Sequence, residues 1–228
     1  MSGTYSHRQF LSGSWLKVIA LLSMTVDHVA LFFLRENPVP LFSLLGVTVT
    51  LYRVLRLAGR MAFPIYGFLI AEGYLYTRNR ARYGLALLLL AIVSQIPWSL
   101  RFSNLNVIVT LFCGYLGIWV YEAFRGRPFL RIFALLLLVA FLVIFPSDGG
   151  YRGFGFVLAM HILRRHETGR AVIGTCLLSS PFSVLGFLPI HFYSGKRGFL
   201  GRGWEKYFFY LYYPLHLLIL FWLSGSPA

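Results

Sequence analysis

The stretch LKVIALLSMTVDHVALFF, residues 16–33, is apolar over about the length that crosses a lipid bilayer as an α-helix. It nevertheless carries Lys17 near its start and the pair Asp27 and His28 well inside it. Ionisable side chains within a bilayer cost about 2.5–3.5 kcal/mol each on insertion scales, and they usually face a bundle interior or a water-filled cavity. The stretch therefore predicts a membrane helix with one polar, functional face.

The composition of the whole chain agrees with a membrane protein. Of the 228 residues, 58% are hydrophobic and 12% are charged, against roughly a quarter charged in soluble domains. The apolar residues come in runs of about 17 to 20, which is typical of spanning helices. We predict an all-α fold, a polytopic transmembrane helical bundle of about eight spans, within a range of about six to ten. Residues 1–228 should form a single integral membrane domain, because no stretch has the composition of a linker.

The individual spans can be located from these runs. The clearest are residues 15–34, 60–77, 83–100, 105–123, 129–145 and 206–224. Residues 38–57 are apolar but interrupted by Arg53 and Arg56, which suggests a short or interfacial helix. Residues 150–163 are short for a span. Residues 171–192 are long enough, but SSPF at 179–182 divides them into one kinked helix or two half-helices.

The net charge of the chain is +14, and its basic residues lie mainly in the short loops between the apolar runs. The segments TRNRARY (77–83), RGRPFLR (125–131) and RRHETGR (164–170) are basic, as expected for cytoplasmic loops. All three lie on the side of the N-terminus if residues 38–57 do not cross the membrane. We therefore predict a multi-pass protein of the bacterial inner membrane, in contact with lipid, with a cytoplasmic N-terminus. The basic loop at 195–206 lies on that side only if residues 171–192 make an even number of crossings. No folded part presents the basic surface that nucleic acid would need.

Two further site types are not indicated. Cys113 and Cys176 both lie in apolar runs, where small core residues are expected rather than a disulfide or a metal pair. No His, Asp or Glu cluster has metal-ligand spacing, so no metal site is predicted.

The first helix places its ionisable groups in a definite relation. Lys17 and His28 are eleven positions apart, so they point the same way and lie roughly 16 Å apart along the axis. This arrangement suggests a tunnel with a cation at its mouth and a titratable base in its depth, since histidine titrates near neutrality. Asp27 is rotated about 100° from His28, so it either bonds another helix or curves round to orient the imidazole. The plainer alternative is a buried ion pair of Asp27 or Glu72 with Arg60.

Several motifs resemble one family in the same order along nearly the whole chain. They are LKVIALLSMTVDHVA (16–30), GRMAFPIYGFLIAEGYLYTRN (59–79), SQIPWSL (94–100), LNVIVTLFCGYLG (105–117), DGGYRG (148–153) and KYFFYLYYPLHLLIL (206–220). Together they resemble the TraX family, whose namesake is a membrane protein that N-acetylates the amino terminus of conjugative pilin. The first helix also resembles the basic-x10-His signature of acyltransferase-3 type membrane acyltransferases, with Lys17 where that group usually has arginine.

The resemblance implies an acetyltransferase that moves an acetyl group from cytoplasmic acetyl-CoA to a membrane-associated or envelope acceptor. The acceptor would be a peptide amine such as a pilin N-terminus, or an amine or hydroxyl of a polysaccharide. His28 would be the general base, or a transient acetyl carrier. Arg60 would polarise the carbonyl or hold a carboxylate. Glu72 would orient His28 or bind the acceptor amine, and Asp27 would complete the catalytic set.

Other residues are candidates for binding acetyl-CoA. Lys17 and the cytoplasmic basic loops would receive its phosphates. Tyr213 and His216 share a face at i and i+3 in the last span, close to Lys206. Asn106 would line the cavity or cap a helix, and the sequence leaves both open.

Two other functions are compatible with the same residues. A small-solute or proton-coupled transporter also needs intramembrane acids, bases and broken helices. A structural subunit would use the buried charges as assembly contacts.

Overall fold

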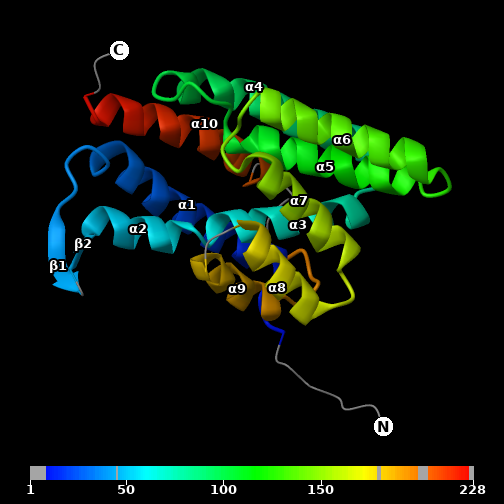
Figure 1. The fold of residues 1–228 in the computed structure, drawn as a ribbon, viewed down its shortest axis with the longest axis horizontal. Helices are drawn as coiled ribbons and strands as arrows, with labels where there is room; N and C mark the ends of the chain where they lie inside the picture. The colour runs from blue at the N-terminus through cyan, green and yellow to red at the C-terminus, as the bar shows by residue number, and fades with distance from the viewer. Residues whose placement is uncertain (1–8, 45, 179–180, 200–204, 226–228) are drawn as a thin grey trace, which may run out of the picture.

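The computed structural model describes residues 9–44, 46–178, 181–199 and 205–225. The chain is mostly helical, with one small antiparallel hairpin (Figure 1). The elements are, in chain order, α1 (Gly13–Phe33), β1 (Pro40–Leu44), β2 (Val47–Thr50), α2 (Leu51–Gly59), α3 (Ala62–Tyr76), α4 (Arg80–Ser99), α5 (Val107–Ala123), α6 (Pro128–Ile144), α7 (Gly150–Ile162), α8 (Glu167–Leu178), η1 (Pro181–Gly186), α9 (Phe187–His191) and α10 (Glu205–Leu223).

The apolar runs of the sequence become helices within a few residues of the predicted bounds. Within the described residues, three helical segments are long and apolar enough to cross a membrane: Gly13–Phe33, Leu51–Tyr76 and Arg80–Ser99. The second combines α2 and α3, which are separated by two residues. Helices α5, α6 and α10 are apolar but shorter. The total of about eight spans therefore stays a prediction.

Polar side chains set where several of these helices begin. The Ser12 hydroxyl, the Thr50 hydroxyl and the Asn79 side-chain carbonyl accept hydrogen bonds from backbone N–H groups in the first turns of α1, α2 and α4. The first N–H groups of a helix lack partners within it, and a bilayer offers no water to replace them. These caps let the apolar runs start as helices.

Two segments differ from the simplest prediction. Residues 38–57 form a hairpin, with Phe42 opposite Val49 and an irregular register before it, followed by the short helix α2. The alternating VTVT of β2 has β-branched residues at every position, and this favours a strand over a helix. Residues 171–192 divide between α8, η1 and α9, with residues 179–180 outside the described part. This agrees with two half-helices rather than one continuous helix.

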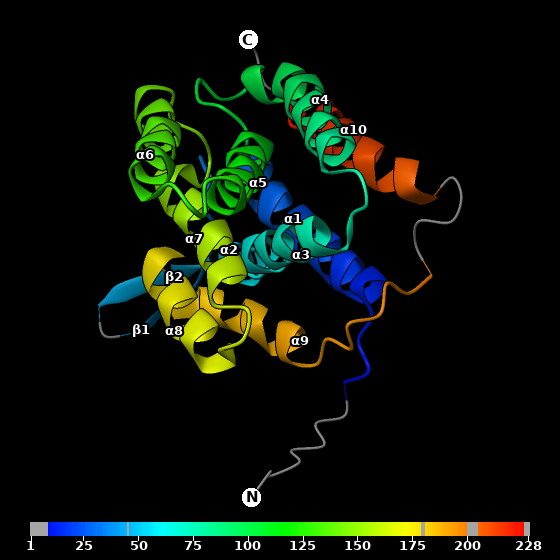
Figure 2. The same cartoon turned by 90° about the vertical axis from the view of Figure 1, so that its right-hand side faces the viewer.

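Helix α1 runs through the middle of the bundle. It packs against α2, α3 and α10, and Figure 2 shows it between α3 and α10. Helix α5 in turn packs against α3, α4, α6 and α7. The main hydrophobic core gathers side chains from α1, α3, α4, α5, α7 and α10. This places the polar face of α1 inside the molecule.

Helix α6 shows the opposite pattern. Leu142 is its one buried residue among those described, and large apolar side chains such as Phe129, Phe133 and Leu136 are exposed. A helix that is apolar on every side and largely uncovered by protein requires an apolar solvent, which lipid provides. The outer surface of this bundle is therefore suited to a membrane.

The start of α1 lies against the basic loop before α10. The N–H groups of Gly13 and Ser14 donate to the carbonyl oxygens of Lys196 and Arg197 at 2.8 and 3.0 Å. The loop at 192–197 and the N-terminal end of α1 are therefore at the same end of the bundle, as expected if residues 171–192 turn back rather than cross once.

Candidate active site

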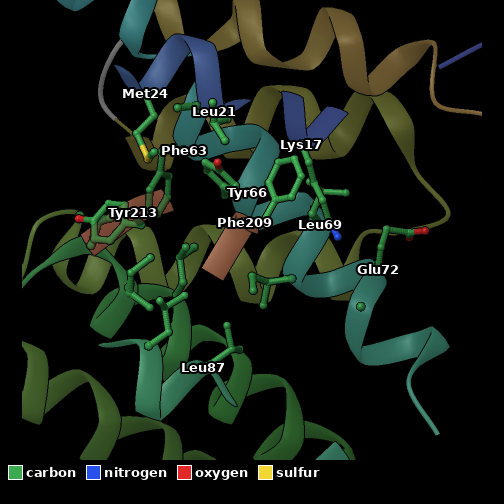
Figure 3. Close-up of a pocket in the computed structure, with 18 of the residues that line it drawn as sticks. Lys17, Leu21, Met24, Phe63, Tyr66, Leu69, Glu72, Leu87, Phe209 and Tyr213 are labelled. Carbon is green, nitrogen blue, oxygen red and sulfur yellow. The ribbon is translucent and has the colours of Figure 1, made fainter. Parts of the chain in front are cut away.

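A cavity of about 1020 Å³ runs beside α1 and is walled by α3, α4, α5 and α10. Figure 3 shows the apolar part of its wall, with Leu21, Met24, Phe63 and Leu87 around the open space. Ligand pockets are commonly about 300–1,000 Å³, so this cavity is at the large end of that range. Its size suits a ligand with an extended chain.

Lys17 and His28 both line this cavity, together with Leu21 and Met24 between them. The four positions follow the helical repeat and therefore share one face of α1. Both residues stand where the sequence placed them, on one face with Lys17 near the start of the helix.

His28 is buried, with 4% of its surface exposed, and its partner is a second histidine. Its Nδ1 atom lies 2.7 Å from Nε2 of His216 on α10, and the ring planes are 11° apart. The Nδ1 atom of His216 lies 2.8 Å from the carbonyl oxygen of Tyr212. Two rings from two helices are thus linked in one hydrogen-bonded chain.

This chain determines which nitrogen of His28 carries a lone pair. A carbonyl oxygen can only accept, so Nδ1 of His216 donates to Tyr212. In the neutral ring Nε2 of His216 is then an acceptor, and Nδ1 of His28 donates to it. The remaining nitrogen of His28, Nε2, is the one able to accept a proton.

A second contact joins the same two helices beside the histidine pair. The hydroxyl groups of Thr25 and Tyr212 lie 2.7 Å apart, and the ring of Tyr212 stacks on that of His216 at a 16° angle. Thr25 and His28 are three residues apart on α1, and Tyr212 and His216 are four apart on α10, so the two contacts lie one above the other. They hold α10 in a fixed position against α1.

The two ends of the cavity have different charges. Near the start of α1, Lys17, Arg78 and Arg197 line it. Near the other end of α1, Asp27, Arg56, Arg60, Asp148 and Arg152 do so. The cavity therefore joins two different ends. One end is cationic apart from the acid Glu72, and the other end carries both positively and negatively charged side chains. His28 lies toward the mixed end, one position after Asp27.

Known sequences place this architecture in a family. A profile of the TraX protein family matches residues 12–224. The chain belongs to the TraX family. It is also 29% identical over 240 residues to the probable fimbrial assembly protein FimC, serogroup H1, of Dichelobacter nodosus, with 90% of this chain and 92% of that protein covered. No solved structure shows a significant match to the chain.

In this TraX-family chain, the ion pair of Asp27 differs from the expected one. The Asp27 carboxylate binds the guanidinium of Arg56 on α2, and not Arg60. Asp27 also does not orient His28, because His216 takes that position. Arg56 lies on α2, which packs beside α1, at the height of Asp27. Arg60 lies about one turn later in the chain and lines the cavity.

Glu72 lies far from the position that would let it orient His28. It lines the cavity near Lys17, on the last turns of α3 (Figure 3). The prediction that Glu72 orients the imidazole is wrong, because the sequence gives no register between α1 and α3. Its other predicted role, contact with a substrate, stays a prediction.

Asn106 is a structural residue and not part of the cavity wall. It is fully buried, its Oδ1 accepts from Ile108 N, and its Nδ2 donates to the Ala91 carbonyl and to Oε1 of Gln95, each at 2.9 Å. Of the two roles left open, the helix cap is the one observed. The amide also ties α5 to α4.

The last span supplies both a cavity residue and a partner of His28. Tyr213 lines the cavity, whereas His216 bonds His28. His216 therefore contacts His28, and its predicted contact with acetyl-CoA stays a prediction. The side chain of Lys206 lies outside the described residues.

Sequence reasoning missed Arg56 and Asp148 as cavity residues. Arg56 was noted only because it interrupts an apolar run, and Asp148 appeared only as the first residue of the motif DGGYRG; neither was assigned to the site. Their position in the bundle was the missing information. Within the described part of the chain, no group of three His, Cys, Asp or Glu side chains could hold a metal ion.

Proposed function

We propose that this protein is an integral inner-membrane acetyltransferase that transfers an acetyl group from cytoplasmic acetyl-CoA to an acceptor in or across the membrane. His28 is the general base. The observation that carries this proposal is the pairing of His28 with His216 in the wall of a large cavity whose other end is cationic.

The base fits the reaction that acetyl transfer to an amine requires. The amine nitrogen attacks the thioester carbonyl carbon, and a C–N bond forms as the C–S bond breaks. Nε2 of His28 takes a proton from the attacking nitrogen and returns it to the departing CoA thiolate. His216 holds His28 in the tautomer that leaves Nε2 unprotonated.

The cationic end of the cavity fits the donor. CoA carries several phosphates on a long, flexible arm that ends in the thioester. Lys17, Arg78 and Arg197 would bind the phosphates as cations. The roughly 16 Å between Lys17 and His28 would be spanned by the arm, so that the thioester reaches the base.

The family membership supports the acceptor class. The relative from Dichelobacter nodosus is named as a fimbrial assembly protein, and the TraX namesake acts on a pilin amino terminus. A pilin-like peptide amine is therefore the first acceptor to test, with an amine or hydroxyl of an envelope polysaccharide as the second.

The placement of the basic loops supports entry of acetyl-CoA from the cytoplasm. The start of α1, Arg78 after α3 and the loop at 192–197 surround the cationic end of the cavity. Under the positive-inside rule these segments face the cytoplasm. In this proposal the N-terminus is cytoplasmic, and the end of the cavity near Asp27 lies toward the opposite side of the membrane.

The direct test is transfer of radiolabel from acetyl-CoA to an acceptor by purified protein in detergent. Wild-type protein should label a peptide with a free amino terminus, and His28→Ala should lower the rate by about 100- to 10,000-fold. His166→Ala is a matched control, because His166 is exposed and does not line the cavity. Near-normal turnover by a folded His28→Ala variant would contradict the proposal.

The same preparation separates an enzyme from a transporter. In proteoliposomes, solute uptake that needs no CoA, without labelling of any acceptor, would favour a small-solute or proton-coupled transporter.

A further inference from the structure

The hairpin of β1 and β2 stands apart from the rest of the bundle. Its strands run across the axes of α1 and α2, and both views place it at the edge of the molecule (Figures 1 and 2). Among the described elements it packs mainly against α2, where the Leu51 N–H donates to the Val39 carbonyl oxygen at 2.9 Å. None of its described residues lines the large cavity. The candidate active site therefore does not explain the hairpin.

The hairpin lies at the level where two helical segments that could cross a membrane end. One segment ends at Phe33, shortly before β1, and the other begins at Leu51, directly after β2. Helices that cross a bilayer are tilted on average by only about 20° from its normal. Strands that run across such helices therefore lie close to the membrane plane. This places the hairpin along a membrane surface, at the end of α1 that is opposite Gly13.

The two faces of the hairpin differ in polarity. Phe42 is paired with Val49, and Ser43 is paired with Thr48. Successive residues of a strand point to opposite faces, and paired residues share a face. Phe42 and Val49 therefore lie on one face, and Ser43 and Thr48 lie on the other. The hydroxyl groups of Ser43 and Thr48 are 3.4 Å apart, which agrees with this assignment. The hairpin thus has an apolar face and a polar face.

The bundle leaves the apolar side chains of the hairpin uncovered. Phe42 is 56% exposed, and Val39 and Leu41 just before it are 48% and 49% exposed. An isolated two-stranded hairpin is marginally stable at best in water, and exposed apolar clusters mark contact surfaces. Phe33 at the end of α1 and Val54 at the start of α2 are exposed as well. The apolar outer surface of the bundle, which suits lipid, therefore continues from both flanking helices into the hairpin.

Basic side chains flank the same hairpin. Arg35 follows α1, Arg53 lies in the first turn of α2, and both are exposed. The Arg53 guanidinium donates to the carbonyl oxygen of Thr48 at 3.2 Å, so it lies beside strand β2. Guanidinium groups bind phosphate well, and a membrane surface presents lipid phosphates. Apolar and aromatic side chains on one face, with basic groups at the same level, are typical of elements that lie in the membrane interface.

We propose that the β1–β2 hairpin is an interfacial membrane anchor. Phe42 and Val49 face the acyl chains, and Ser43 and Thr48 face water. The occupant of the apolar face is lipid, in the leaflet at the end of α1 that is opposite Gly13. Because β2 continues directly into α2, the anchor fixes the depth of α2 in the bilayer. This surface is separate from the cavity, so the proposal does not depend on acetyl transfer.

Nitroxide accessibility in liposomes tests the two faces. Phe42→Cys and its matched control Ser43→Cys are labelled in a Cys176→Ser protein, in which the remaining Cys113 is buried. Vesicles contain phosphatidylcholine and phosphatidylglycerol. The label at 42 should collide mainly with oxygen, which concentrates in lipid, and the label at 43 mainly with a water-soluble nickel chelate. Phe133→Cys on the exposed apolar surface of α6 gives the lipid reference.

Three outcomes would overturn the anchor. Equal access of the nickel chelate to both labels would place the hairpin in water. A lipid-exposed label at 43 with a water-exposed label at 42 would reverse the assigned faces. Protection of the label at 42 from both reagents would show that protein, such as a second copy of this chain, covers the apolar face. Labels at Val49→Cys and Thr48→Cys should repeat the results at 42 and 43, because strand pairing joins these positions.

Quenching by brominated lipids gives a second readout that needs no cysteine. Phe42→Trp adds one tryptophan to the five of the wild-type chain, whose emission serves as the background. Lipids brominated on the acyl chain near the headgroup should quench the added emission several-fold more than that of Ser43→Trp. Each variant should retain the wild-type midpoint of thermal unfolding in detergent, since both positions are exposed. Equal quenching of two variants that meet this condition would overturn the anchor.

Discussion

Nδ1 of His28 on α1 and Nε2 of His216 on α10 lie 2.7 Å apart, although 188 residues separate them in the chain. The link connects the first and last helices of the bundle at the cavity wall. Because His216 also donates to the Tyr212 carbonyl, its role toward His28 is set by the backbone of α10. His216 is therefore a positioning residue, and its replacement should affect the chemical step.

Removal of the acceptor atom of His216 should impair proton transfer by His28. In His216→Leu, Nδ1 of His28 loses its partner, and the tautomer with a lone pair on Nε2 is no longer favoured. We expect kcat to fall about 100-fold, with KM for acetyl-CoA near the wild-type value. Steady-state kinetics with acetyl-CoA and a peptide amine measures both constants.

The conservative variant distinguishes positioning from a purely structural role. His216→Gln keeps a side-chain oxygen that can accept from Nδ1 of His28, so it should recover much of the lost kcat. Equal kcat values for the Leu and Gln variants, at equal thermal stability in detergent, would show that the hydrogen bond does not support the reaction.

Lys17 should act on acetyl-CoA rather than on the acceptor. Lys17→Gln removes one cation from the mouth of the cavity, and a charge-assisted contact is worth about 1.5–3 kcal/mol. KM for acetyl-CoA should therefore rise about tenfold or more, while KM for the amine acceptor stays constant. Lys17→Arg, which keeps the charge, should remain close to wild type. An unchanged KM for acetyl-CoA in Lys17→Gln would place the phosphates elsewhere.

Gly59 should be required for the close contact between α2 and α1. A Cβ atom added at Gly59 would overlap the carboxylate of Asp27 and displace it from Arg56. Overpacking of this kind costs about 1–3 kcal/mol, so Gly59→Ala should lower the midpoint of thermal unfolding in detergent. Gly155→Ala is the control, because its Cβ would meet Leu177 at an ordinary 3.7 Å. An equal effect of the two substitutions would contradict the overlap.

The helices could be predicted from sequence because their signal is local. Long apolar runs ended by polar residues located α1, α3, α4, α5, α6 and α10 within a few residues. The hairpin at 40–50 was missed, since its apolar content matched that of a helix and only the β-branched VTVT distinguished it. The division of 171–192 could be anticipated because Pro181 interrupts the run.

The site was predictable where one helix supplies it. Lys17 and His28 share a face of α1, so helical geometry alone placed both in the cavity. The partners of His28 and Asp27 come from other helices, and a single sequence contains no register between helices. His216 was therefore taken for a CoA contact, and Arg60 was expected where Arg56 binds.

Asn106 should contribute to stability and not to the reaction. Asn106→Ala removes the cap of α5 and the bonds to Ala91 and Gln95 in a fully buried position, at a cost of about 1–3 kcal/mol. Asn79→Ala removes an exposed cap of α4 and should cost less. Thermal unfolding in detergent ranks the two variants, while kcat and both KM values of the folded Asn106→Ala protein should match wild type. A rise in KM for acetyl-CoA alone would contradict this prediction and assign Asn106 to the binding site. An amide with only a structural role changes the fraction of protein that is folded and does not change the affinity of the folded protein for its substrate.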